Sequence, residues 1–362
     1  FVLNEGLARW QLATGETLLE GAIHRLGRPV QYVFLPYLLL WSFFVGAALM
    51  SACGVAMNAM VPIFENPVHG KVVFGILHSL MGVGLVLLGG FKLFEKVMTV
   101  CIGMMFVIVV TTAAIICENW SEMFRGLIIP TIPQLNGPGL SWTVALMGGV
   151  GGTLTVLCYG YWMRETARSK MAHLKTCRLD LGLAYAATAL FGVAMVIIGS
   201  SIPQLPPGGG AKLIVNLADM LEVSLGPICK WTFLVGAWSA IFSSLFGVWQ
   251  AVPYLFADFW RMTRAHKKNR QPAGETVEVN TGGWAYRGYL WSIAIVPMLG
   301  LVVDFSQIQK VYAIFGAMFM PMVAIVLLIL NGKADWVSRH RNRPVTVGIL
   351  LATLAVFLFF GY

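Results

Sequence analysis

The sequence predicts an all-α, polytopic membrane protein, and three observations lead to this prediction. Of the 362 residues, 58% are hydrophobic and 11% are charged, whereas a soluble globular domain carries about 25% charged residues. The mean hydropathy is +0.76. The apolar residues form runs long enough to cross a hydrocarbon layer of roughly 30 Å as helices, and too long for the roughly 10-residue strands of a barrel.

The apolar runs give about nine transmembrane helices. The predicted spans are residues 32–60, 72–88, 97–116, 141–163, 180–202, 231–257, 288–303, 311–330 and 345–361. The seventh span is the shortest, so it has to tilt little or thin the bilayer locally. The six cysteines show no CxxC pair, and we interpret them as small packing residues.

The loops between these spans predict the orientation. Twenty Lys and Arg residues fall in the alternate loops 1–31, 89–96, 164–179, 258–287 and 331–344. The other loops hold five, which are Lys71, Arg125, Lys212, Lys230 and Lys310. Because cytoplasmic loops retain Lys and Arg, residue 1 is expected in the cytoplasm and the C-terminus outside. The polar loop 261–287 can be a solvated loop or can bind anionic lipid headgroups.

The sequence contains no motif for enzyme chemistry. There is no nucleophile elbow, phosphate-binding glycine loop or HExxH, and no carboxylates face each other within a span. We therefore expect no enzymatic activity, no catalytic residue and no resident cofactor. The net charge of +9 follows from the basic loops, so no nucleic-acid partner is expected.

The fourth span is the most informative segment. It holds Gly148, Gly149, Gly151 and Gly152, followed by Thr153 and Thr155, near the middle of the span. Each glycine costs about 1 kcal/mol in a helix interior. The cluster favours a break in the helix, where free carbonyl oxygens bind ions in many secondary transporters. The alternative is a glycine face for close helix packing.

Ionisable residues are scarce inside the spans. The acidic residues Glu118, Asp180, Asp258 and Asp304 sit at span ends. His78 is the one ionisable residue well inside a span, and it is either a proton relay or a hydrogen-bonded structural histidine.

Four segments resemble the Nramp family of divalent-metal transporters. ARWQLATGETLLEGA (8–22) resembles the stretch before the third helix of that family, and GGFKLFEKV (89–97) its link between helices four and five. FRGLIIPTIP (124–133) resembles the loop before helix six, and residues 217–259 the helix-eight region. The order and spacing match over nearly the whole chain.

The resemblance implies an inverted-repeat transporter fold of five plus five helices. The chain is then expected to be N-terminally incomplete, without the first two helices, as a single transmembrane domain over 1–362. Residues 1–31 form a cytoplasmic entry, 32–330 a partial inverted-repeat core and 345–361 an extra C-terminal helix. In the family, a break in helix one supplies acidic and amide metal ligands, so the missing helix is expected to supply the acidic ligand here.

The resemblance also predicts the site. The fourth span aligns with the family's helix-six break, which places Thr155 at the metal-binding Met, Val156 at the Pro and Leu157 at the His. The backbone of Gly151 and Gly152 and the hydroxyl of Thr155 are expected to line the cation path, with Thr153 and Tyr159 nearby. The family's proton-transfer acids of helix three align with Gly46 and Leu49.

This pattern is closest to that of the Nramp-related magnesium transporters. Oxygen ligands suit Mg²⁺ or Mn²⁺ better than softer metals, so we expect uptake of one of these ions without proton coupling. One alternative is a transporter of an amino acid or other small organic solute, and another is a non-transporting membrane scaffold. A monomer in a bacterial inner membrane is expected.

Overall fold

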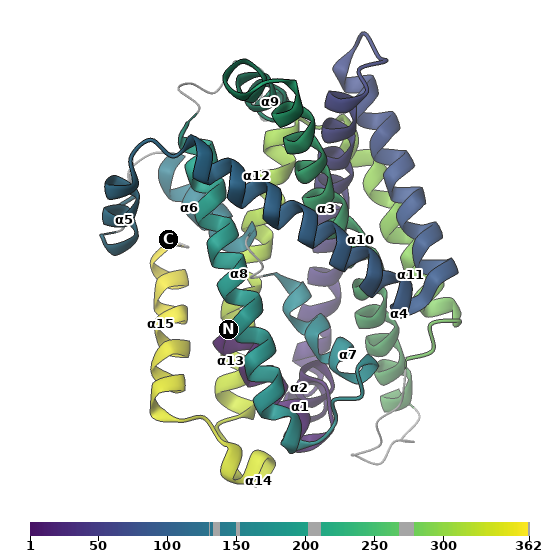
Figure 1. Cartoon of the computed structure of the whole chain (residues 1–362). Helices are drawn as coiled ribbons and strands as arrows, with labels where there is room; N and C mark the ends of the chain where they lie inside the picture. The colour runs from purple at the N-terminus through teal and green to yellow at the C-terminus, as the bar shows by residue number, and fades with distance from the viewer. Residues whose placement is uncertain (130, 133–137, 150–152, 202–210, 268–278, 361–362) are drawn as a thin grey trace.

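The computed structural model of the chain describes residues 1–129, 131–132, 138–149, 153–201, 211–267 and 279–360. All regular structure in these ranges is helical (Figure 1). The α-helices are α1 (Val2–Thr14), α2 (Leu18–Leu26), α3 (Arg28–Met60), α4 (Pro67–Ile116), α5 (Trp120–Ile128), α6 (Pro138–Gly149), α7 (Cys158–Glu165), α8 (Leu174–Ser200), α9 (Ala211–Leu225), α10 (Pro227–Lys267), α11 (Trp284–Ile295), α12 (Phe305–Ala317), α13 (Phe319–Leu330), α14 (Ala334–Val337) and α15 (Pro344–Phe360). Four short 3₁₀ helices are η1 (Leu154–Leu157), η2 (Met171–His173), η3 (Val296–Val302) and η4 (Ser338–His340).

The predicted all-α membrane fold is confirmed. Within the described ranges, six helices are long and apolar enough to cross a bilayer, and α14 to α15 adds a seventh candidate that bends by 118°. Among the six, α4 covers two predicted spans. Gly90 has a φ of +57°, which a glycine adopts without strain, and it bends α4 there. Figure 1 shows the chain running back diagonally from this bend toward α5.

The central span is α3, which packs against α4, α10 and α12. Its small residues allow close approach, because a Cβ at Gly54 would collide with the carbonyl group of Lys71 on α4. On the other side of the contact, a Cβ at Gly75 would lie 2.7 Å from the Met50 carbonyl oxygen. Without a hydrophobic drive between helices in lipid, such contacts supply much of the packing.

The short seventh span is extended by a change of helix type. Residues of α11 are followed without a gap by the 3₁₀ helix η3, which has Pro297 in its first turn. A 3₁₀ helix rises about 2.0 Å per residue instead of about 1.5 Å, so it covers more of the bilayer with the same number of residues. Together the two helices form a candidate span from Trp284 to Val302.

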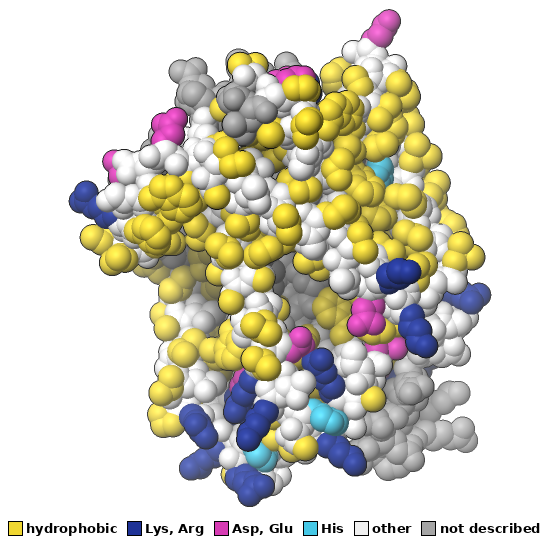
Figure 2. All heavy atoms as spheres, viewed as in Figure 1, with side chains coloured by type: hydrophobic (Ala, Val, Ile, Leu, Met, Phe, Trp, Pro, Cys, Tyr) yellow, Lys and Arg dark blue, Asp and Glu magenta, His cyan; other side chains and the backbone are white. Residues whose placement is uncertain are grey.

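Charge separates along the long axis of the molecule. Figure 2 shows apolar side chains over the upper and middle parts of this face, and most visible Lys and Arg at the lower end. The lower end includes α1, α2 and α14 (Figure 1). The distribution agrees with the division of Lys and Arg between the predicted loops.

The segment 1–31, predicted as a cytoplasmic entry, contains a buried helix. Leu7, Ala8 and Trp10 of α1 are fully buried, and α1 packs against α7, α8 and α13. Arg9 donates to the His340 carbonyl oxygen (2.7 Å) and to Asn342 Oδ1 (2.9 Å), so α1 also joins the bend before α15.

The Gly54 contact predicts a stability defect. Replacing Gly54 with Ala places a methyl group against the α4 backbone and should destabilise the protein by about 1–3 kcal/mol. Gly182→Ala on α8 is the matched control, because nothing lies within 4 Å of its Cβ position. Thermal unfolding of the two purified variants in detergent checks this, and equal unfolding temperatures would contradict the close contact.

A second prediction concerns α2, outside the spans. His24 Nδ1 lies 3.2 Å from Glu16 Oε1, and this hydrogen bond raises the pKa of His24 above its ordinary value. Because the pKa of His24 is higher in the folded state, its protonation stabilises the folded protein. This stabilisation is fully present below about pH 6.5, the ordinary pKa of histidine, and is lost as the pH rises through the raised pKa. His24→Gln should therefore lower the unfolding temperature most at low pH. A difference that stays constant or grows between about pH 5.5 and 8.5 would contradict the prediction.

Candidate functional site

Thr153, in the middle of the fourth predicted span, has a non-helical backbone, which agrees with the break that the glycine cluster predicts. The helix α6 ends at Gly149, and Thr153 has an extended backbone with φ −105° and ψ −178°. The chain then forms η1 and continues directly into α7. Gly151 and Gly152, whose carbonyl groups were predicted to face the cation, lie outside the described residues.

The structure brings two of the predicted site residues together. The hydroxyl oxygens of Thr153 and Thr155 lie 2.7 Å apart, and the Thr155 backbone N–H donates to Thr153 Oγ1 (3.4 Å). Thr153 is 2% exposed. Each hydroxyl keeps acceptor lone pairs beyond this mutual bond, so the pair can offer oxygen ligands to a cation.

The helix α12 holds the break from one side. A Cβ at Gly316 of α12 would lie 2.6 Å from the methyl carbon of Thr153, so the glycine leaves room for that methyl group. Gly148 approaches the backbone of α12 so closely that a Cβ would collide with the carbonyl oxygen of Ala313. A larger side chain at Gly148 would push α6 away from α12 and displace Thr153.

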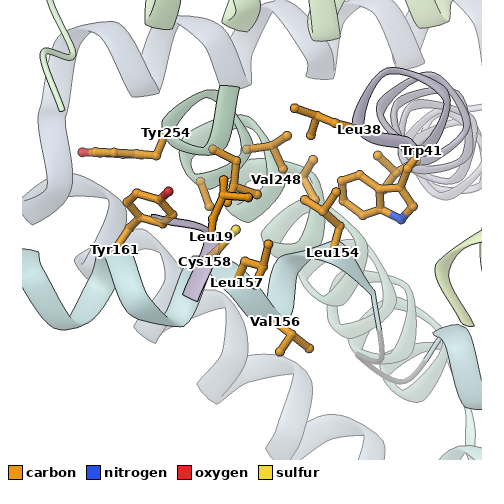
Figure 3. Close-up of a cluster of buried hydrophobic side chains, with 14 of the residues drawn as sticks. Leu19, Leu38, Trp41, Leu154, Val156, Leu157, Cys158, Tyr161, Val248 and Tyr254 are labelled. Carbon is orange, nitrogen blue, oxygen red and sulfur yellow. The ribbon is translucent and has the colours of Figure 1, made fainter. Parts of the chain in front are cut away.

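Apolar packing fixes the chain after the break. Figure 3 shows Leu154 and Leu157 of η1 among side chains from neighbouring helices, with Trp41 and Leu38 of α3 at one end and Tyr161 and Tyr254 at the other. Val156 and Leu157, at the family's Pro and His positions, are both buried. These side chains carry no titratable group, so they cannot relay a proton.

Tyr159 points elsewhere. Its hydroxyl donates to Asp180 Oδ2 on α8 (3.4 Å), and Arg168 also donates to Asp180 Oδ2 (2.7 Å). Its ring packs against an apolar cluster that includes Leu12 and Met163. The hydroxyl is thus directed at α8, one helix away from the threonine pair.

His78 is fixed as a neutral, structural histidine. Nδ1 lies 2.7 Å from the Phe74 carbonyl oxygen, which can only accept, so Nδ1 carries the hydrogen. Nε2 then accepts from Trp238 Nε1 (2.8 Å). Protonation of Nε2 would break the bond to Trp238, which favours the structural role over the relay.

Gly46 and Leu49 stand where the family has the acidic residues of helix three. At Gly46 there is no room for an acidic side chain. A Cβ at Gly46 would lie 2.5 Å from the ring of Pro297, and Leu49 is buried. Across the described residues, no group of three His, Cys, Asp or Glu side chains is arranged to hold a metal ion.

Sequence reasoning missed a partly buried ionic cluster, which we define as Glu20, Tyr161, Arg164, Asp258 and Arg261. It lies near the lower end and joins α2, α7 and α10. The signal was present as two pairs at helical spacing, Tyr161 with Arg164 and Asp258 with Arg261. Neither pair shows on its own that the two helices meet.

Comparison with known proteins now identifies the family. The family model described as natural resistance-associated macrophage protein-like, or Nramp, matches residues 1–362. The chain belongs to the Nramp family. It is therefore a membrane transporter of divalent metal ions and not an enzyme.

Solved structures support the fold. A mutant form of a manganese transporter from Eremococcus coleocola superposes with a TM-score of 0.73 at 14% identity, covering 99% of this chain and 76% of the other. The manganese transporter from the same organism with an aromatic bis-isothiourea compound gives 0.71 at 15% identity, with the same coverage. MhsT in complex with L-phenylalanine gives 0.63 at 14% identity, covering 99% and 88%. No curated protein sequence matches the chain.

Proposed function

We propose that this Nramp protein carries Mg²⁺ or Mn²⁺ through the break in its fourth span, without moving protons. The observation that supports this most is the hydroxyl pair of Thr153 and Thr155 at the break. Both ions prefer oxygen ligands, whereas the thioether that the family has at the Thr155 position favours softer metals. Carbonyl groups of Gly151 and Gly152 would add further oxygen ligands.

The absence of proton coupling rests on three positions. Leu157 stands at the family's His position, Gly46 has a proline ring where an acidic side chain would extend, and His78 uses both ring nitrogens in hydrogen bonds. Ion entry is then driven by the electrochemical gradient of the cation alone. Mg²⁺ gives up its water reluctantly, and the smaller side chain at Thr155 would let it pass partly hydrated.

We further propose a monomer in a bacterial inner membrane with residue 1 on the cytoplasmic side. The Lys and Arg side chains at the lower end support this orientation (Figure 2). The MhsT structure shows that a related fold is found with L-phenylalanine bound, so transport of a small organic solute is the competing function.

Flux measurements in liposomes test the proposal. The intact protein should admit Mg²⁺ or Mn²⁺ with no accompanying change in internal pH. Thr155→Met should shift the preference toward Cd²⁺ by about tenfold, the equivalent of about 1.4 kcal/mol, because it exchanges an oxygen ligand for sulfur.

Thr155→Ser is the matched control, because it keeps the hydroxyl and should keep the preference for Mg²⁺ or Mn²⁺. Internal acidification in step with metal entry would overturn the uncoupled mechanism. No divalent flux from folded protein, with uptake of an amino acid instead, would overturn the metal assignment.

A further inference from the structure

The end of α10 and the start of α11 carry a basic and aromatic group that the proposed cation path does not use. Arg264 lies in the last turn of α10, and its guanidinium carbon lies 4.8 Å from the ring centroid of Trp260 and 5.5 Å from that of Trp284. The two rings meet edge to face, with centroids 5.1 Å apart. Cation–π attraction therefore fixes one positive charge at the junction of the two helices.

This junction lies at the depth where a membrane protein meets lipid headgroups. The two candidate spans run from Pro227 to Arg264 and from Trp284 to Val302, so Arg264 ends one span and Trp284 begins the next. Both span ends lie in the lower half of Figure 1, toward the end where most visible Lys and Arg gather in Figure 2. Tryptophan is enriched at this depth, because its ring is apolar and its N–H is polar.

The junction carries positive charge that no acidic side chain balances in the described part of the chain. Arg264 and Arg287 are both exposed, and neither forms an ion pair within the described ranges. Arg261, three residues before Arg264, is instead paired with Asp258 and Glu20. An exposed cation at this depth attracts the anionic headgroups of a membrane.

From Trp284 toward the middle of the bilayer, one face of α11 and η3 is apolar and exposed. The exposed side chains on this face include Trp291, Ile295 and Leu299. Together with Trp284 and Gly288 they recur every three or four residues, so they follow one another along the helix surface. A cation above an apolar stripe matches a phospholipid, which carries its phosphate at one end and its acyl chains below.

Gly288 opens a slot in this stripe. It lies one turn from Trp284 and one turn from Trp291, and nothing lies within 4 Å of its Cβ position. Residues seven apart in an α-helix are separated by about 10 Å along the axis, so the two rings leave space between them. An acyl chain can lie in this space against the backbone of α11.

Trp260 also connects the junction to the central span. Its ring stacks on Phe256 with centroids 6.0 Å apart, and Phe256 stacks on Tyr289 of α11 at 4.3 Å. The hydroxyl oxygens of Tyr289 and Ser42, on α3, lie 2.8 Å apart. A ligand that holds Arg264 against Trp260 therefore also supports the contact of α10 and α11 with α3.

We propose that Arg264, Trp260 and Trp284 form a binding site for an anionic phospholipid of the leaflet at the Lys- and Arg-rich end. The guanidinium group binds the headgroup phosphate, and an acyl chain lies in the slot at Gly288. An anionic headgroup fits better than a zwitterionic one, whose own cation competes with the guanidinium group for the phosphate. The site goes beyond the proposed transport function, because its binding is measured without a metal ion or a gradient.

Native mass spectrometry of the intact protein tests the site. Phosphatidylglycerol or phosphatidylcholine is added to the protein in detergent, and the bound lipids are counted as the lipid concentration rises. The unaltered protein should bind one phosphatidylglycerol at least fivefold more tightly than phosphatidylcholine. Arg264→Gln should weaken phosphatidylglycerol binding by about fivefold, the effect of one basic side chain at an anionic membrane surface, and leave phosphatidylcholine binding unchanged.

A second variant and a matched control separate the site from general attraction to the basic end. Gly288→Leu keeps every charge and fills the slot, so it should weaken the binding of both lipids. It should fold normally, because its Cβ position is open and leucine favours a helix more than glycine does. Arg341→Gln is the control, because it removes the same charge from an exposed side chain at the same end and has no aromatic ring against it among the described residues.

Equal losses of phosphatidylglycerol binding in Arg264→Gln and Arg341→Gln would overturn the site, because diffuse attraction to the basic end would explain both. Equal affinity of the unaltered protein for the two lipids, or full binding by Gly288→Leu, would also overturn it. Displacement of the lipid by an equal concentration of glycerol phosphate would assign the site to a soluble anion instead. Dimers in place of lipid-bound monomers would assign this face to a second copy of the chain.

Discussion

A helix that stops inside a bilayer leaves backbone groups without partners, and lipid cannot satisfy them. Such a break is stable only where protein covers it or where it lines a polar cavity. Here Thr153 meets part of this demand, because its hydroxyl accepts from the backbone N–H of Thr155 at the start of η1. Gly148 and Gly316 allow α6 and Thr153 to lie directly against α12, and Leu154, Val156 and Leu157 bury the other side of the chain. The same interruption that needs this support also holds the two hydroxyl oxygens that we propose face a cation.

The two halves of the broken span are held by different kinds of contact. On the α6 side the contacts are backbone against backbone, and they leave little freedom. On the α7 side the contacts include a hydrogen bond from Tyr161 to Asp258 of α10 and an ion pair between Arg164 and Glu20 of α2. Packing through glycines and pairing of charges are two different physical means of holding the break.

The sequence predicts the spans well, because the thickness of the hydrocarbon layer sets how long an apolar run has to be, and runs of that length are visible in the sequence. It also predicts the break, because four glycines in five positions conflict with an uninterrupted helix. The kink at Gly90, whose backbone is not helical, falls in the predicted loop 89–96 and separates the two predicted spans within α4. Burial of α1 could not be predicted, since Glu5 and Arg9 make it look like a surface helix. They are buried because Arg178, His340 and Asn342 meet them from elements far away in the chain. The ionic cluster escaped prediction for the same reason, as its members come from three helices and only the fold brings them together.

The central claim is that the threonine pair at the break in the fourth span faces the transported ion. Anomalous diffraction from crystals of the intact protein grown with Mn²⁺ tests it most directly, because the metal is located without reference to any activity. The account predicts a peak within about 2.5 Å of the hydroxyl oxygen of Thr153 or Thr155, the range of metal–oxygen bonds for these ions. A strong Mn²⁺ peak elsewhere in the membrane-spanning region, with the threonine hydroxyls still bonded only to each other, would contradict it.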